Sequence, residues 1–305
     1  MELVKKIDIH AHAVAFPEYY PPYLRPEQPQ VRFVSAPELL EHYDRLNIEK
    51  GILLAISSPE AQLSPMTSEA CKYLTVMYPG RFEWCCNVDP RAGSNSPETD
   101  LSHFLRHYQA LGAKGVGELT SNLYADSPMV DNLFARCAEL DMPVTIHISP
   151  KLGRGYGIVD ELGLPRIEKM LKKHPKLKIV GHSQPFWAEI SGDLTEEKRN
   201  GYPTGKVVEG ALTRLMRECD NLYCDLSAGS GANAMMRDPE HAAKFMEEFS
   251  DRIMYGCDIC TKGNTHQYDF DAFLTQMVET GALSMENYKK IVRENAIRVF
   301  KIEVE

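Results

Sequence analysis

Long apolar runs are missing from this chain of 305 residues. No run reaches the roughly 18 residues that a membrane-spanning helix needs, so we expect no membrane partner. The opening residues, Met-Glu-Leu-Val-Lys-Lys, also lack the basic-then-apolar order of a signal peptide. We therefore expect a cytoplasmic protein.

Basic residues are in deficit, because 34 Lys and Arg stand against 43 Asp and Glu, giving a formal net charge of −9. Proteins that bind nucleic acid generally present a basic face, so no nucleic-acid partner is expected. Cys257 and Cys260 form a Cys-x-x-Cys, but the sequence has no second such pair, which disfavours a zinc knuckle. Several other cysteines fall in strand-like runs, which predicts reduced, buried thiols.

Linkers and low-complexity segments are also absent, so we expect a single domain over residues 1–305. Short apolar segments alternate with helical ones throughout. The predicted strands are 4–10, 50–56, 82–88, 114–118, 143–148, 177–181, 221–226 and 252–257. The predicted helices begin at Ser35-Ala36-Pro37-Glu38, a capping-box pattern, and continue at 65–78, 98–111, 128–140, 163–174, 204–219, 238–249, 266–280 and 285–299.

Eight strand–helix units predict an α/β fold of the (β/α)8 TIM-barrel type. A doubly wound open sheet is the rival architecture. Its dinucleotide-binding form carries a Gly-x-Gly-x-x-Gly after the first strand, which this sequence lacks. The glycines at 153–157 have a different spacing and are predicted to form a loop. The segment 13–34, with five prolines and an aromatic cluster, is predicted to cover the barrel mouth as a lid.

Two histidines one residue apart follow the first predicted strand. Side chains at positions i and i+2 of a strand share a face, so His10 and His12 leave the strand side by side. Other predicted strands also end in metal-binding side chains, which are Glu118, His147, His182 and Asp258. In a barrel these ends share one rim, and imidazole with carboxylate suits zinc, iron, manganese or cobalt.

Each of these residues also has an ordinary structural interpretation. A single strand-end histidine is often a hydrogen-bonded core residue, Asp258 could cap the following helix, and Glu118 could pair with a lysine. The remaining histidines fall on helical stretches and are expected to be structural, except His266, which is a candidate for substrate contact. The joint placement of six residues at one rim is what favours a metal site.

The motifs together resemble the amidohydrolase superfamily, in particular the branch that contains aminocarboxymuconate-semialdehyde decarboxylase and the resorcylate decarboxylases. The similar segments are Asp8-Ile9-His10-Ala11-His12, residues 143–147 and 177–182, Tyr255-Gly256-Cys257-Asp258 and the closing residues 295–300. They span the whole chain. The sequence after His182 departs from the branch, which often has glycines there, so the pocket wall is expected to differ.

The resemblance implies a barrel with a divalent metal at its mouth, most simply Zn²⁺, with Mn²⁺, Fe²⁺ or Co²⁺ as alternatives. His10, His12, His147 and Asp258 would bind a single ion, with His182 behind it. In the second arrangement, Glu118 bridges two ions, as in the deoxyribonuclease branch of the superfamily, and His147 and His182 bind the second.

Two reactions fit such a site. In a hydrolase, a metal-activated water attacks a small amide, ester or lactone, with Asp258 as general base and then acid and His182 stabilising the oxyanion. In a non-oxidative decarboxylase, Asp258 or His182 protonates the carbon of a small aromatic or unsaturated acid as CO2 leaves. The second needs a cation at the mouth, for which Arg25, Arg32 and Arg154 are candidates. A small-molecule substrate is expected in either case, and homo-oligomerisation stays open.

Overall fold

The computed structural model describes residues 4–19, 32–61, 64, 66–153 and 155–304. Its parallel strands confirm all eight predicted positions. They are β1 (Lys6–Ala11), β2 (Ile48–Leu54), β3 (Phe82–Cys85), β4 (Val116–Leu119), β5 (Val144–Ser149), β7 (Ile179–His182), β8 (Leu222–Asp225) and β9 (Ile253–Met254). A ninth, β6 (Ile158–Val159), pairs with the end of β5 and was not predicted. The strands are buried almost throughout, as expected of parallel strands covered on both faces.

Backbone hydrogen bonds join the strands into a ring. The strand order is β1-β2-β3 in one sheet and β4-β5-β7-β8-β9 in the other. Between β3 and β4, the N–H of Cys86 donates to the carbonyl of Gly115 at 3.0 Å. Between β9 and β1, the N–H of Ile9 donates to Tyr255 at 3.1 Å and that of Asp258 donates to His10 at 2.8 Å. The predicted barrel architecture is therefore confirmed, and the strands do not form the alternative open sheet.

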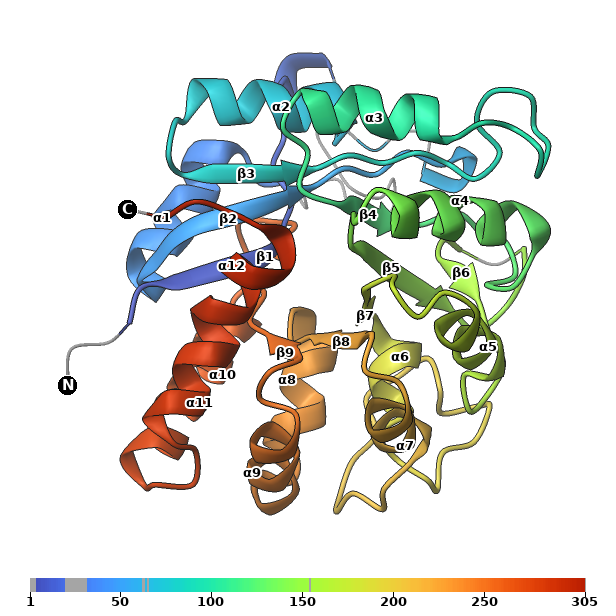
Figure 1. Cartoon of the computed structure of the whole chain (residues 1–305). Helices are drawn as coiled ribbons and strands as arrows, with labels where there is room; N and C mark the ends of the chain where they lie inside the picture. The colour runs from blue at the N-terminus through green and yellow to red at the C-terminus, as the bar shows by residue number, and fades with distance from the viewer. Residues whose placement is uncertain (1–3, 20–31, 62–63, 65, 154, 305) are drawn as a thin grey trace.

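Helices surround this ring (Figure 1). Those at predicted positions are α1 (Ala36–Leu46), α2 (Ser68–Met77), α3 (Ser102–Ala110), α4 (Pro128–Glu139), α5 (Pro165–Lys173), α7 (Ala211–Glu218), α9 (Pro239–Glu248) and α10 (His266–Glu279). At the start of α1, Glu38 accepts a hydrogen bond from the backbone N–H of Ser35 at 3.1 Å, as the capping-box pattern predicted. A threonine side chain caps the N-terminus of α2, and a serine side chain caps the N-terminus of α4.

Two helices follow strand ends directly and were not predicted. α6 (Gln184–Ala188) begins two residues after β7, and α8 (Ala228–Met236) begins three residues after β8. Both are largely buried. The segment after His182, where the sequence departs from the resembling branch, is therefore a short buried helix. The predicted helix 204–219 begins only at Ala211, since residues 204–210 are not helical.

The last predicted helix, 285–299, consists of three parts. α11 (Met285–Lys289) and α12 (Asn295–Phe300) flank a π-helical turn at Lys290–Glu294. The wide turn contains Ile291, whose carbonyl accepts the N–H of Tyr255 in the barrel wall at 2.9 Å. The π turn thus ties the closing helix to the barrel beside β9.

The apolar interior of the barrel is a separate cluster from the shell between strands and helices. Side chains from six strands, among them Ile7, Ile9, Val180 and Met254, pack with Val299 and other residues of α12. The chain end beyond α12 lies at the strand starts, because the carbonyl of Glu303 accepts a hydrogen bond from Lys50 near the start of β2 at 2.7 Å. The opposite rim, at the strand ends, is left for polar side chains.

No helix in the described part of the chain is both long and apolar enough to span a bilayer.

Candidate metal centre

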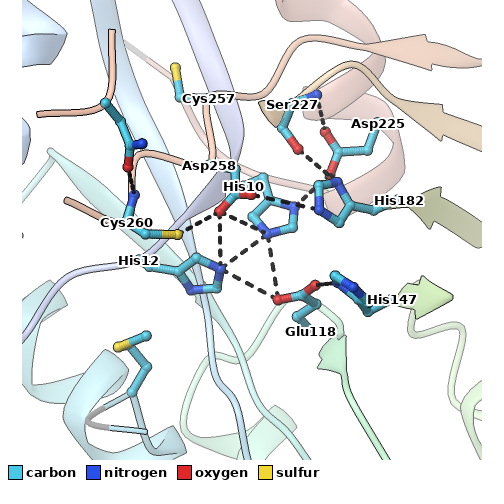
Figure 2. A network of polar contacts seen from close by, with 12 residues as sticks. His10, His12, Glu118, His147, His182, Asp225, Ser227, Cys257, Asp258 and Cys260 are labelled. Atoms are coloured by element: carbon cyan, nitrogen blue, oxygen red, sulfur yellow. Dashed lines mark hydrogen bonds and ion pairs between the residues drawn. The ribbon is translucent and has the colours of Figure 1, made fainter. Parts of the chain in front are cut away.

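The structure brings all six predicted side chains together at the carboxyl ends of β1, β4, β5, β7 and β9 (Figure 2). His10 and His12 lie side by side, with 3.1 Å between their Nε2 atoms. The pairing of β1 with β2 shifts register between Asp8 and Ala11. Such an irregularity re-aims a side chain at a strand end, and here both imidazoles face the same centre.

The Glu118 carboxylate lies between two groups of histidines. Its Oε2 is 3.5 Å from His12 Nε2 and 3.7 Å from His10 Nε2. Its Oε1 is 2.6 Å from His147 Nδ1 on the next strand. The structure gives Glu118 histidine partners and no lysine among the described residues. One carboxylate therefore contacts both halves of the cluster.

Asp258 occupies the opposite side of the cluster. Its Oδ1 is 3.8 Å from His10 Nε2 and 3.7 Å from His12 Nε2, and its Oδ2 is 3.7 Å from His182 Nε2. The residue has φ of 51°, a left-handed conformation that aspartate tolerates better than most residues. It does not cap the following helix, since α10 begins after Thr265. Its two oxygens face three imidazoles instead.

A buried carboxylate behind the cluster, Asp225, was not predicted. Its Oδ2 lies 2.6 Å from His10 Nδ1 and 3.4 Å from His182 Nδ1. The Ser227 hydroxyl contacts the same nitrogen of His182 at 2.9 Å. These partners hold Nδ1 of His10 and of His182, so the Nε2 atom of each ring faces the centre. Metal-binding histidines are usually oriented in this way by a hydrogen bond to the other ring nitrogen. Asp225 ends β8, so its position at a strand end is the sequence signal that indicates it.

Asp8 anchors the backbone of the site. Its carboxylate accepts the N–H groups of His10 at 2.9 Å and Cys257 at 2.8 Å and the hydroxyl of Tyr43 at 2.7 Å. Burial raises the pKa of Asp8 to about 6, although these three donors oppose the rise. The residue thus ties β1 to the segment after β9, which carries Asp258.

Gly256 leaves room for this packing. A Cβ at this position would lie 2.6 Å from Asp225 Oδ1 and 3.2 Å from His10 Cβ. Real Cβ atoms essentially never come within 3.0 Å of another atom, so a larger residue would displace the Asp225 carboxylate that orients His10.

The Cys-x-x-Cys is reduced, and its two thiols have different surroundings. Cys257 is buried, with its sulfur 3.9 Å from the hydroxyl of Tyr255. Cys260 donates to Asp258 Oδ1 at 2.9 Å, and burial raises the pKa of its thiol. The sequence motif suggested no role for Cys260 at the rim, because the contact depends on the loop that follows β9.

Charges in the cluster stabilise one another. Burial opposes ionisation of Glu118, but His147, His10 and His12 outweigh it and hold the pKa of Glu118 well below its usual range. Burial likewise opposes protonation of His10, yet Asp225 and Asp258 raise its pKa well above the usual value. Asp225 has a lowered pKa because His10 and His182 overcome its burial. Glu118 and Asp225 are therefore anionic and favour positive charge at the centre.

The donor set fits a divalent cation. Three overlapping trios have ligand atoms within 4.8 Å of one another, namely His10-His12-Glu118, His10-His182-Asp258 and Glu118-His147-His182. Imidazole with carboxylate is the set found in zinc and related first-row metal sites. In addition, Nδ1 of the buried His12 finds no hydrogen-bond partner among the described residues.

Other predicted residues lie at the margin. His266 bonds the carbonyl of Cys257 through Nε2 at 3.0 Å, so the structure holds it near the rim. Arg32 pairs with Glu38 and is not directed at the cluster. Arg25, Arg154 and most of the predicted lid fall outside the described residues. The ring of Tyr156 lies 4.5 Å from that of His147, and no sequence pattern indicated this contact.

Two further histidines have partners that fit their structural assignment. His42 contacts the hydroxyl of Tyr268 at 2.8 Å, and His174 contacts Asp131 at the same distance. His103 and His107 are exposed on α3. The ring of His241 packs against that of Phe245. None of the five belongs to the clusters described above.

A barrel of this kind, with imidazole and carboxylate groups at its strand ends, defines the class of metal-dependent α/β-barrel enzymes. Within that class the chain belongs to the amidohydrolase family, whose sequence profile matches residues 7–302. It is therefore an enzyme of the amidohydrolase superfamily, as the motifs predicted. No curated protein sequence matches the chain at a significant level.

Solved structures with this fold include both decarboxylases and hydrolases. A 2,6-dihydroxybenzoate decarboxylase from Rhizobium has 16% identity and a TM-score of 0.62, covering 98% of this chain and 99% of its own. A probable 2-pyrone-4,6-dicarboxylic acid hydrolase from Acinetobacter baumannii has 15% identity and a TM-score of 0.62, covering 98% and 100%. A manganese-bound dihydroxybenzoic acid decarboxylase from Polaromonas sp. JS666 has 18% identity and a TM-score of 0.61, covering 99% and 98%. At this identity the likeness shows the shared fold.

Proposed function

We propose that this enzyme is a metal-dependent hydrolase of a small amide, ester or lactone, working with a two-ion centre. The observation that carries the proposal is the position of Glu118. Its two oxygens face different histidine groups, at 3.5 Å from His12 and 2.6 Å from His147. A carboxylate placed in this way suits a bridge between two cations, and two-ion centres typically serve hydrolysis.

The ligand sets follow from the same contacts. His10, His12, Asp258 and one oxygen of Glu118 would hold the first ion, and the other oxygen with His147 and His182 the second. A bound divalent cation supplies acidity to a coordinated water and polarises the carbonyl of the substrate. We propose Zn²⁺ as the natural ion because the set is rich in imidazole, with Mn²⁺, Fe²⁺ and Co²⁺ as substitutes.

Asp258 is the proposed general base and acid. Its side chain is 18% exposed, the largest exposure among the carboxylates of the cluster, so it can exchange a proton with a substrate at the mouth. In the two-ion centre His182 Nε2, 3.7 Å from Asp258 Oδ2, would be a ligand of the second ion, whereas with a single ion it would be free to stabilise the developing oxyanion. Asp225 and Ser227 hold the His182 ring through Nδ1 and so keep Nε2 directed at the centre of the cluster.

Decarboxylation is the second candidate, favoured by the Asp258–His182 pair, since either group could protonate a carbon. Such a substrate is anionic and calls for a cation at the mouth. The pairing of Arg32 with Glu38 weakens this candidate. We also propose a small-molecule substrate and a cytoplasmic location, the latter because all eight cysteines are free thiols.

Metal reconstitution tests the proposal. Chelator-treated protein should be inactive, and Zn²⁺ or Mn²⁺ should restore hydrolysis of members of a lactone, ester and amide panel. A parallel assay should follow CO2 release from carboxylated aromatics and dienes. Release of CO2 without hydrolysis would replace the proposed reaction with the second candidate, and full activity without metal would refute both.

Glu118→Gln tests the bridge. The variant should bind one ion per chain where the native enzyme binds two, and kcat/KM should fall about 100-fold or more, since even outer-sphere changes cost 10–100-fold. Glu139→Gln is the matched control, because this exposed carboxylate on α4 pairs with Arg136. Native metal content and activity in Glu118→Gln would contradict the two-ion centre.

A further inference from the structure

Cys260 extends the cluster on the side of His12 and Asp258. Its Sγ lies 2.9 Å from Asp258 Oδ1, and that oxygen is 3.7 Å from His12 Nε2. The sulfur, an oxygen of Asp258 and a nitrogen of His12 all lie within 4.8 Å of one another, which makes a fourth trio of potential ligands. In Figure 2, Cys260 directs its sulfur toward Asp258 from the side opposite His182.

The loop around Cys260 holds the sulfur in this place. The N–H groups of Cys260 and Thr261 both donate to Asn264 Oδ1, at 3.0 and 2.8 Å. The carbonyl of Cys260 accepts the N–H of Val34 from a distant part of the chain at 2.9 Å. Backbone contacts on both sides therefore present the thiol to the cluster.

Resting on the function proposed above, we infer that Cys260 is a ligand of the ion held by His12 and Asp258. On binding, the thiol releases its proton to water, and a sulfur lone pair forms the bond to the cation, so no oxidant or reductant takes part. Two zinc ligands lie at most the sum of their bond lengths apart, which is about 4.5 Å for sulfur with oxygen and about 4.3 Å for oxygen with nitrogen. The observed sulfur–oxygen distance of 2.9 Å and oxygen–nitrogen distance of 3.7 Å fall within these limits.

A thiolate changes which cations the site prefers. Soft sulfur ligands favour zinc and other thiophilic ions over manganese or magnesium, which prefer oxygen. The site of this enzyme should therefore discriminate against Mn²⁺ more strongly than a centre made of imidazole and carboxylate alone.

Cobalt substitution tests the inference without an activity assay. The metal-depleted full-length protein is titrated with Co²⁺ and its absorption spectrum recorded. A thiolate bound to Co²⁺ gives an intense charge-transfer band in the near ultraviolet. The band should appear in the native protein, disappear in Cys260→Ser and Cys260→Ala, and persist in Cys257→Ser, whose sulfur lies near the Tyr255 hydroxyl. In competition, the preference for Cd²⁺ over Mn²⁺ should fall about tenfold or more in Cys260→Ser.

The outcomes separate the two proposals. Stoichiometric Co²⁺ binding by native protein without the band overturns the ligand role of Cys260 and leaves the proposed hydrolase intact. A band that persists in Cys260→Ser also overturns it. A protein that binds no metal overturns both proposals. Because the native spectrum alone can refute the inference, a variant that fails to fold does not prevent the test.

Discussion

The Asp225 carboxylate contacts two imidazoles of the centre from behind and is itself fully buried. Asp225→Asn removes the negative charge that orients His10 and His182 while keeping the side-chain shape. Metal affinity should fall about 10–100-fold, as is usual when an outer partner of a metal-binding histidine is lost. Competition with a chromophoric chelator measures it.

A second aspartate–histidine pair supplies the control. Asp131 lies 2.8 Å from His174 on the outer helices. Asp131→Asn should leave metal affinity unchanged. Native affinity in Asp225→Asn would show that the Nε2 atoms are oriented without this carboxylate.

Gly256 allows a direct test of packing at the same place. In Gly256→Ala the new methyl group would lie 2.6 Å from Asp225 Oδ1 and 2.9 Å from Ser227 Cβ. Overpacking of this kind typically costs about 1–3 kcal/mol, so urea denaturation should show a loss in that range. Gly263→Ala meets no atom within 4 Å and should be close to neutral. Equal stability of the two variants would mean that the site relaxes around the added methyl group.

At the scale of elements, the side-chain amide of Asn295 is one of the contacts that attach the closing helix to the barrel. Asn295 donates to the carbonyls of Ser250 at 2.7 Å and Ile253 at 2.8 Å, next to the strand that precedes Asp258. Asn295→Ala leaves two buried carbonyls unpaired, so the free energy of unfolding should drop by about 1–3 kcal/mol. Asn132→Ala, which loses one half-buried bond to Thr99, should cost less. An equal loss in both variants would argue against this attachment.

The sequence predicts the elements unevenly, for physical reasons. Strands are recognisable because parallel strands buried on both faces are short apolar runs, as in residues 179–182. α8 was missed because Gly229 and Gly231 disfavour a helix locally, and tertiary packing overrides that preference: a Cβ on Gly231 would lie 2.4 Å from the Leu226 carbonyl oxygen. The π turn depends on a partner, Tyr255, which follows β9 and is distant in sequence.

The site residues divide in the same way. His10, Glu118 and Asp258 are found from sequence because each ends a strand, and barrel geometry gathers strand ends at one rim. Asp225 obeys the same rule and was overlooked. The contact of Cys260 with Asp258 arises from a turn held by Asn264, and no periodicity encodes such a turn.

At the scale of the whole molecule, ligand binding should stabilise the fold. Ligands of the proposed centre come from five strands, so a cation that binds only the native state raises the free energy of unfolding by mass action. The gain is about 2.7 kcal/mol when the free ion is at 100 times its Kd. Calorimetry of chelated protein with and without Zn²⁺ should show a rise of about 3–5 °C or more. Ca²⁺ is the control and should have little effect, because it prefers oxygen ligands. A melting temperature indifferent to Zn²⁺ would contradict a shared centre.

The junction of β9 with β1 has a consequence for biosynthesis. The bond from Cys257 N–H to Asp8 joins residues 249 positions apart. At the usual 5–20 residues per second, a ribosome takes about 12–50 s to make that span. His10 and His12 therefore emerge long before Asp258 exists, and the coordination sphere can be completed only after Asp258 has been translated. Metal acquisition by this enzyme should be a post-translational event, detectable as apo-protein in cells grown under zinc limitation.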